Sequence, residues 1–242
     1  MESDKPHQVA LITGASRGLG ATLAEFLAAQ GYDLVLTARG ATDLETIARS
    51  LSKYGGKVVA PAGDVTDARH RRQLVEAARE LGRLDLLVNN ASELGPMPHL
   101  EDYPLESLEQ VFGVNVFAPL ALIQEALPLL KQSEGLIVNL SSDAAVAGYP
   151  NWGGYGASKA ALDLISRTLA NELHEAGVGV VSVDPGDMRT AMHQQAFPGE
   201  DISDRPTPDV TLPFWAWLLG QDPLAVSGGR YKAQAEQWEV VS

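Results

Sequence analysis

Short, almost continuously apolar segments alternate along the chain with longer segments of mixed polarity. Six of the short segments are rich in Val, Leu and Ile: 9–13, 33–37, 57–60, 84–89, 136–140 and 178–183. Strands that are covered on both faces have this near-continuous apolar pattern rather than a strict alternation. The regular exchange of strand-like and helix-like segments predicts an α/β fold with a single doubly wound parallel sheet, helices on both faces and right-handed crossovers.

The longer segments show helical periodicity. In the first of them, Leu19 and Leu23 follow the spacing of an amphipathic helix, and Gly31 stands where a C-terminal cap belongs. Further helices are predicted over 43–53, 67–81, 105–130 and 155–176. Pro119 and Pro128 are expected to kink or end segments of the fourth helix, because proline lacks a backbone N–H.

The C-terminal part of the chain is less regular. Residues 193–213 contain several prolines and acids without clear periodicity, which predicts a loop or flap over the site, with a substrate loop around 188–212. A short apolar helix over 212–219 and a final edge strand over 229–234 are expected to follow. Because no linker, low-complexity tract or internal repeat divides the sequence, one domain over 1–242 is expected.

Charge and composition exclude several classes of function. The formal net charge of −13 argues against nucleic acid and against anionic membrane surfaces, since both partners need clustered Lys and Arg. The absence of cysteine excludes disulfides, thiolate metal ligands and thiol catalysis. The histidines are scattered, so no metal site is expected. Residues 1–6 are polar, with no signal peptide and no apolar stretch long enough to span a membrane, so a cytoplasmic location is expected.

A glycine-rich turn, Thr13-Gly14-Ala15-Ser16-Arg17-Gly18-Leu19-Gly20, directly follows the first strand. Glycines at such a turn let backbone N–H groups approach a pyrophosphate, and the following helix N-terminus adds partial positive charge. The spacing G-x-x-x-G-x-G differs from the usual G-x-G-x-x-G fingerprint, and a plain tight turn is the alternative interpretation. The position of the turn favours a Rossmann-type dinucleotide site that uses Gly14, Ser16, Arg17, Gly18, Leu19 and Gly20.

The end of the second strand indicates which dinucleotide binds. NAD sites usually place an acid there for the ribose 2′-hydroxyl, but this strand ends in Thr37-Ala38-Arg39. Asp33 lies at the wrong end of the strand, and Asp43 is expected to belong to the start of a helix. Arg39 and Arg17 can hold a 2′-phosphate from two sides, although either could be a solvated surface charge. The pair predicts NADP(H).

Three residues form a candidate proton-transfer group. Lys159 follows Tyr155 by one helical turn, so both project from the same face. A phenol with a pKa of about 10 is a poor acid–base catalyst near neutrality, and a nearby ammonium favours its phenolate. Ser142 lies just past the strand 136–140, at the carboxyl edge of the sheet, where doubly wound folds bind ligands.

In these pieces the chain resembles the short-chain dehydrogenase/reductase family, in its compact single-domain form. The resemblance extends from Val9 to about Met192 and more loosely to the end. The matching pieces, in the family's order and near its spacings, are 13–20, Asp64, Asn89-Asn90-Ala91, Asn115, Ser142, Tyr155, Lys159, Pro185-Gly186 and Thr190.

The resemblance implies a proton relay beside the nicotinamide. Tyr155 would give its proton to a carbonyl oxygen that Ser142 holds, while Lys159 would bind the nicotinamide ribose and lower the Tyr155 pKa. Asn115 would hold a water that links Lys159 to solvent. The further cofactor contacts that it implies are Asp64, Val65, Asn90, Ala91, Tyr155, Lys159, Pro185, Gly186, Met188 and Thr190.

Some of these residues also have a structural interpretation. Asp64 could belong to a helix start, with Thr66 or Asp67 as the cap. Asn89 and Asn115 could serve only to satisfy buried backbone groups.

The prediction is an NADPH-dependent reduction of a ketone or aldehyde to an alcohol, with Tyr155 as the general acid. Two alternatives stay open: an NADP-dependent alcohol dehydrogenase in the oxidative direction, and a non-catalytic NADPH-sensing regulatory protein. A medium-sized, partly hydrophobic small molecule is the expected substrate, and a homodimer or homotetramer is expected from the apolar faces of the fourth and fifth helices. Ser92 replaces the family's usual glycine, and the tail lacks an Asp-Gly-Gly ending, which weakens a fatty-acid-synthesis assignment.

Overall fold

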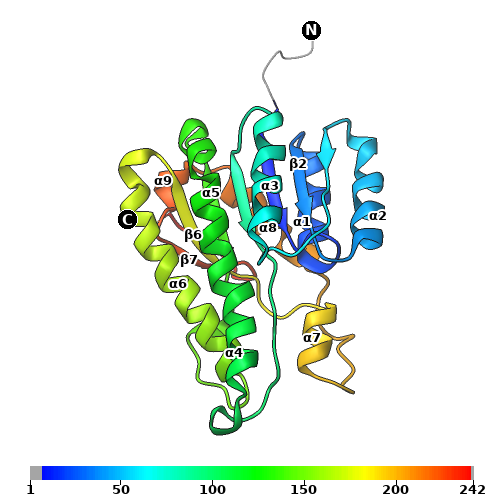
Figure 1. The fold of residues 1–242 in the computed structure, drawn as a ribbon, viewed down its shortest axis with the longest axis vertical. Coiled ribbons are helices and arrows are strands. Elements are labelled where there is room, and N and C mark those ends of the chain that lie inside the picture. Colours follow the sequence, from blue (N-terminus) through cyan, green and yellow to red (C-terminus); the bar gives the residue numbers. More distant parts are fainter. Residues whose placement is uncertain (1–6, 241–242) are drawn as a thin grey trace.

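A seven-stranded parallel sheet lies at the centre of the computed structural model, which describes residues 7–240 (Figure 1). The strands are β1 (Val9–Thr13), β2 (Asp33–Thr37), β3 (Val58–Val59), β4 (Leu86–Asn89), β5 (Leu136–Leu140), β6 (Gly179–Asp184) and β7 (Arg230–Lys232). Their order is β3-β2-β1-β4-β5-β6-β7, so the sheet grows in both directions from β1. This is the doubly wound sheet that the sequence predicts. Residues 1–6, on which the expectation about a signal peptide rests, lie outside the described residues.

Helices cover both faces of the sheet, and alternate strand residues feed two cores. Ala10 and Ile12 point into one core, and Val9 and Leu11 into the other. The first core lies under α1 (Gly18–Ala29), α2 (Ala41–Leu51), α8 (Leu212–Leu219) and α9 (Pro223–Val226). The second lies under α3 (Ala68–Glu80), α5 (Ala118–Ser133) and α6 (Gly153–Leu173). Because every central strand is buried on both sides, the near-continuous apolar pattern of the sequence is explained.

The helical segment before β5 is continuous but not uniform. It comprises α4 (Leu105–Phe112), a π-helical turn (Gly113–Phe117) and α5. Pro119 lies in the first turn of α5, directly after the π-helical turn, where the hydrogen-bond pattern of the helix changes. Pro128 lies inside α5, which continues to Ser133, so this proline does not end the helix, and the kink given as the other expectation stays a prediction.

Length and composition alone would let this segment cross a membrane. The run Leu105–Ser133 contains a window with a mean hydropathy of 1.4, contrary to the expectation that no stretch is long enough. Half of that window is buried inside the fold, against α3 and α6. Its apolar residues therefore belong in large part to the core, and core helices pass the same test.

Near the carboxyl edge of the sheet, the structure departs from the sequence expectations in one segment. The predicted loop after β6 contains a short helix, α7 (Ala191–Ala196), which Thr190 caps by accepting a hydrogen bond from the His193 N–H. Figure 1 shows α7 on the same side of the sheet as α4 and the start of α6, which extend beyond it. These elements surround the carboxyl ends of the strands.

The C-terminal segment closes the first core and returns to the site. Phe214, Trp217, Tyr231 and Trp238 form a cluster with ring centroids 5.4–5.9 Å apart. The Trp238 indole donates to the Lys232 carbonyl, 2.9 Å away. The cluster fixes β7 and the residues after it along the carboxyl end of β6.

Candidate active site

A cavity of about 470 Å³ opens at the carboxyl edge of the sheet, at the ends of the neighbouring strands β1 and β4. The chain leaves these two strands towards opposite faces of the sheet. Its size lies in the usual range for small-molecule and cofactor sites. Of the residues predicted to bind cofactor or substrate, its walls include Gly14, Ser16, Arg17, Gly18, Leu19, Arg39, Asp64, Val65, Asn90, Ala91, Tyr155, Lys159, Pro185, Met188 and Thr190. Gly20, Gly186, Asn115 and Ser142 are not among the residues that line the cavity. Sequence reasoning missed several wall residues, among them Asp43, Gly63 and Val114.

The glycine turn has the close backbone contacts that its sequence predicts. Gly14 and Gly18 adopt φ values of 67° and 55°, a region that favours glycine. A Cβ on Gly20 would lie 2.4 Å from the Gly14 carbonyl oxygen, which leaves no room for any side chain. The Asn90 amide donates to the carbonyls of Thr13 and Gly14, at 2.8 and 3.1 Å, and so holds the turn from the β4 side.

We expect Gly20→Ala to lower the free energy of unfolding by about 2 kcal/mol and to weaken dinucleotide binding, because the added methyl group overpacks the turn. Denaturant unfolding and a titration with NADPH will measure the two effects. Gly113→Ala is the matched control, since a Cβ there meets no atom within 4 Å and the backbone is already helical. A Gly20→Ala protein as stable as the control would contradict the close contact.

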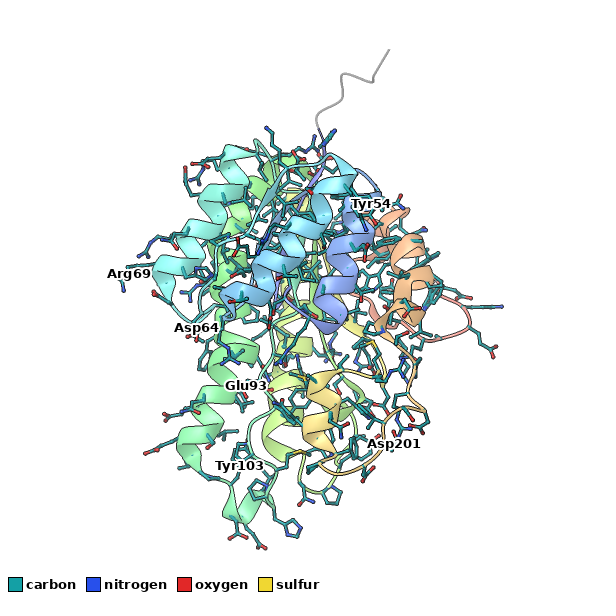
Figure 2. All side chains as sticks on the ribbon, turned by 90° about the vertical axis from the view of Figure 1, so that its right-hand side faces the viewer. Tyr54, Asp64, Arg69, Glu93, Tyr103 and Asp201 are labelled. Atoms are coloured by element: carbon teal, nitrogen blue, oxygen red, sulfur yellow. The ribbon has the colours of Figure 1, made fainter. Side chains whose placement is uncertain are left out.

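Arg39 and Glu93 face one another across the cavity wall. An Arg39 guanidinium nitrogen lies 3.5 Å from a Glu93 carboxylate oxygen, and the Arg39 side chain is 69% exposed. Arg17 is also exposed on the wall. Figure 2 labels Glu93 and Asp64 on the side of the molecule that carries this part of the cavity. Because this exposed ion pair is weak, Arg39 can release the Glu93 carboxylate and bind a phosphate instead.

Asp64 lines the cavity and also accepts hydrogen bonds from the residues just before α3. Burial alone would raise its pKa, but hydrogen bonds from the Thr66 N–H and hydroxyl, together with the charge of Arg39, lower the pKa overall. Asp67, not Thr66, caps α3 by accepting from the Arg69 N–H. Asp64 is therefore an ionised hydrogen-bond acceptor beside Arg39.

Tyr155 and Lys159 meet at the inner end of the cavity, on the first turns of α6. The Lys159 ammonium lies 5.5 Å from the centroid of the Tyr155 ring and donates to the Leu140 carbonyl, 2.7 Å away. Burial lowers the pKa of Lys159 to about 8. Burial also raises the pKa of Tyr155 to about 12, outweighing its hydrogen bonds to Ser92 and Ser142.

The expected lowering of the Tyr155 pKa by Lys159 is therefore not found in this structure. The protein atoms around the phenol remove water that would stabilise a phenolate, and this desolvation is the largest effect. The carboxylates of Asp184 and Asp143 raise the pKa further. Tyr155 is consequently a protonated hydroxyl, and Lys159 is the group of the pair whose pKa lies near neutrality.

Ser142 lies at the end of β5, next to Tyr155, as the sequence predicts. Its hydroxyl donates to a carboxylate oxygen of Asp143 at 3.0 Å and accepts from the Ala144 N–H at 3.2 Å. The Tyr149 hydroxyl donates to the other Asp143 oxygen, 2.9 Å away. Asp143 thus holds the proton of Ser142 in the absence of a ligand, and a ligand carbonyl would have to replace it as acceptor.

Asn115 lies in the π-helical turn and is fully buried. Its amide nitrogen donates to the Glu93 carbonyl and to the Ser158 hydroxyl, and its oxygen accepts from the Glu93 N–H and the Ser92 hydroxyl. Four bonds exhaust the capacity of an amide side chain. If Asn115 binds a water, it must do so through its main chain. Asn89 does not line the cavity, and its amide donates to the Asn139 side-chain oxygen, 2.8 Å away, rather than to a backbone group.

Two residues of the C-terminal segment donate side-chain hydrogen bonds to main-chain carbonyls of the site. Sequence reasoning did not identify them. An Arg230 guanidinium nitrogen donates to the main-chain carbonyl of Ser142, 2.7 Å away. The Gln234 amide donates to the carbonyls of Pro185 and Asp187, at 2.9 and 3.0 Å. No local spacing could have indicated these contacts, because the partners lie far apart along the chain.

Aromatic rings extend from Tyr155 towards α7. Trp152 lies 5.9 Å from the Tyr155 ring and 6.0 Å from the Phe197 ring, centroid to centroid. His193 stacks on Phe197 at 4.8 Å. These rings give the Tyr155 end of the cavity an apolar border. Within residues 7–240, no group of three or more His, Cys, Asp or Glu lies close enough together to hold a metal ion.

The chain is similar to known proteins over most of its length. Residues 8–201 match a family model described as short chain dehydrogenase. A short chain dehydrogenase from Pseudomonas syringae is 37% identical, with a TM-score of 0.89 over 96% of this chain and 98% of that one. A short chain dehydrogenase from Escherichia coli CFT073, in complex with NADPH, is 33% identical, with a TM-score of 0.88 over 94% and 97%. A rhamnolipid-biosynthesis 3-oxoacyl-[acyl-carrier-protein] reductase from Pseudomonas aeruginosa is 36% identical over 91% and 88%.

Proposed function

Since this chain belongs to the short-chain dehydrogenase/reductase family, and is therefore an oxidoreductase, we propose that it reduces a ketone or aldehyde to an alcohol with NADPH. The observation that carries the proposal is the meeting of Tyr155 and Lys159 at one end of a cavity whose other end is the glycine turn with Arg17 and Arg39. One end suits a dinucleotide phosphate, and the other suits proton transfer.

The cavity fits NADP(H) in shape and in charge. Gly14 and Gly18 line the cavity at the N-terminus of α1, where a pyrophosphate would approach, and Gly20 lets the turn pack closely against Gly14. Arg39 after β2 and Arg17 in the glycine turn supply positive charge to the cavity, and no acid stands at the position that usually favours NAD. The NADPH complex of the Escherichia coli relative supports the same cofactor.

The residues around Tyr155 support its proposed role as the acid. When bound, NADPH supplies the hydride that the carbonyl carbon takes up. Tyr155 gives the matching proton to the carbonyl oxygen, and the Lys159 ammonium, 5.5 Å from its ring centroid, offsets the raised pKa by stabilising the phenolate that forms. Ser142 turns its hydroxyl from Asp143 to that oxygen, and Lys159 stabilises the phenolate until solvent returns the proton.

The substrate that we propose is a medium-sized, partly hydrophobic carbonyl compound. Leu94, Met188 and Met192 line the cavity near Tyr155, and Trp152 borders the ring on the other side. Asp143 is the one exposed charge bonded to Ser142, so it disfavours a substrate with an anion next to its carbonyl. The loop of residues 188–212, with α7, is proposed to cover this end.

We expect kcat/KM to fall as the pH rises above about 8. Lys159 carries its charge below its pKa of about 8 and loses it above that value, and a neutral amine no longer stabilises the Tyr155 phenolate. A pH profile at saturating NADPH will show the alkaline limb. Lys159→Arg keeps its charge and should abolish the limb in whatever activity remains. A native profile that is flat from about pH 7 to 10 would contradict this role.

The test of the function is the loss of NADPH absorbance with a panel of ketones and aldehydes, repeated with NADH. Turnover that prefers NADPH supports the proposal. Tight NADPH binding without turnover on any carbonyl would reject it and would favour an alcohol dehydrogenase reaction with NADP⁺ or a non-catalytic NADPH sensor.

We also propose a homo-oligomer, formed by the apolar faces of α4, α5 and α6. Leu105, Phe117 and Leu164 are 74%, 60% and 59% exposed, large values for apolar side chains. Sedimentation of the native protein and of Phe117→Asp will test this interface, because a buried charge there should favour the monomer. A cytoplasmic location and a single domain complete the proposal.

A further inference from the structure

Arg230, on the edge strand β7, is bonded to three parts of the site at once. Its Nε lies 2.8 Å from an Asp163 carboxylate oxygen on α6. Its Nη2 lies 2.7 Å from the Ser142 carbonyl after β5 and 3.6 Å from an Asp184 carboxylate oxygen at the end of β6. The planar fork of a guanidinium suits this arrangement, since it offers several N–H groups in fixed directions.

The two carboxylates need this partner. Asp163 and Asp184 are 7% and 5% exposed, so little water reaches either. A buried carboxylate that loses its only cation is costly. Arg230 is the cation that contacts both, and its own side chain is only 23% exposed.

The residues that Arg230 contacts are close in the fold to Lys159 and Ser142. Asp163 stands one helical turn after Lys159 on α6, and Lys159 itself holds the Leu140 carbonyl. Lys159 and Arg230 therefore fix two carbonyls of one short segment, those of Leu140 and Ser142. The segment that presents the Ser142 hydroxyl is held by a cation on each side.

We propose that Arg230 is a positioning residue: it fixes the main chain of Ser142 and neutralises Asp163 and Asp184 beside Tyr155 and Lys159. Its effect on turnover rests on the proposed function. The charges that act on the pair are Asp163 from α6 on Lys159, and Asp143 and Asp184 on Tyr155. Arg230 and Lys232 from β7 act in turn on Asp184.

Removal of Arg230 should change the Lys159 titration. Asp163 already raises the pKa of Lys159 against the dominant effect of burial. Without Arg230, Lys159 becomes the nearest partner of Asp163, so its pKa should rise by about one unit. NMR titration of ¹³C-lysine-labelled protein measures this without cofactor or substrate, and Lys159→Met identifies the signal.

Two substitutions separate charge from geometry. Arg230→Met should raise the Lys159 pKa and lower kcat about tenfold or more, with NADPH affinity unchanged, because Ser142 loses its anchor. Arg230→Lys should restore the Lys159 pKa but not the full kcat, since an ammonium lacks the fork. Arg83→Met is the matched control: Arg83 pairs with the buried Asp85 at the opposite edge of the sheet, and its loss should leave both readouts unchanged.

The outcomes separate this inference from the proposed function. If Arg230→Met folds and leaves the Lys159 titration at its native midpoint, Arg230 is merely structural and the inference is wrong. If Arg230→Met does not fold, the comparison of Arg230→Lys with native protein decides: an equal kcat rejects the anchoring of Ser142. If the native protein reduces no carbonyl, the proposed function fails, and the Lys159 titration alone still decides whether Arg230 controls the pair.

Discussion

Tyr155→Phe will reduce kcat about a thousandfold while leaving NADPH affinity within about twofold of native. The change removes one hydroxyl, and loss of a general acid typically lowers a rate by about 10²–10⁴. The ring itself remains, so its contacts with Trp152 and with the Lys159 ammonium are kept. Steady-state kinetics and a fluorescence titration with NADPH will give the two numbers.

The matched control is Tyr54→Phe. The Tyr54 hydroxyl donates to Glu25, 3.0 Å away, on the part of the surface labelled in Figure 2 far from Asp64 and Glu93. Tyr54→Phe should therefore leave kcat and NADPH affinity unchanged. Turnover retained in Tyr155→Phe would require another proton donor. A parallel loss of NADPH binding would instead show that the hydroxyl serves the cofactor, and the role proposed for Tyr155 would be wrong.

The sheet was predictable because its physical cause is local. Each central strand is buried on both faces, so its apolar run can be seen without knowing its neighbours, as in 9–13 and 136–140. The glycine turn was predictable for the same reason, since Gly14 and Gly18 need unusual backbone angles wherever the chain goes next. The short helix α7 was not predictable. Its six residues are too few to show helical periodicity, and the prolines and acids that follow indicate a loop.

The electrostatics of the site could be predicted only in part. The helical spacing correctly brings Tyr155 and Lys159 together, and it suggests a lowered phenol pKa. The spacing contains no information about water, and it is the loss of water that sets both pKa values in the folded chain. Arg230 was beyond sequence reasoning altogether, since its partner carbonyl at Ser142 is brought near only by the pairing of β5, β6 and β7.

Arg39→Asp will weaken NADPH binding about a hundredfold and leave NADH binding unchanged or slightly tighter. Arg39 lies on the cavity wall at the end of β2, with a 69% exposed side chain and only a 3.5 Å contact to Glu93. The substitution removes a charge-assisted bond to the 2′-phosphate, worth about 1.5–3 kcal/mol, and adds repulsion. An aspartate there can instead accept from the 2′-hydroxyl of NADH.

Because the chain already carries a net charge of −13, a general charge effect must be separated from a local one. Arg49→Asp makes the same change in charge on α2, at a side chain that is 71% exposed, pairs with Glu45 and lies outside the cavity wall. Beyond about 10 Å, physiological salt screens such a charge, so Arg49→Asp should bind both cofactors like native protein. If Arg39→Asp weakens NADPH and NADH equally, Arg39 does not contact the 2′-phosphate. A large loss confined to NADPH would assign the phosphate to Arg39, and with it the preference for NADP(H).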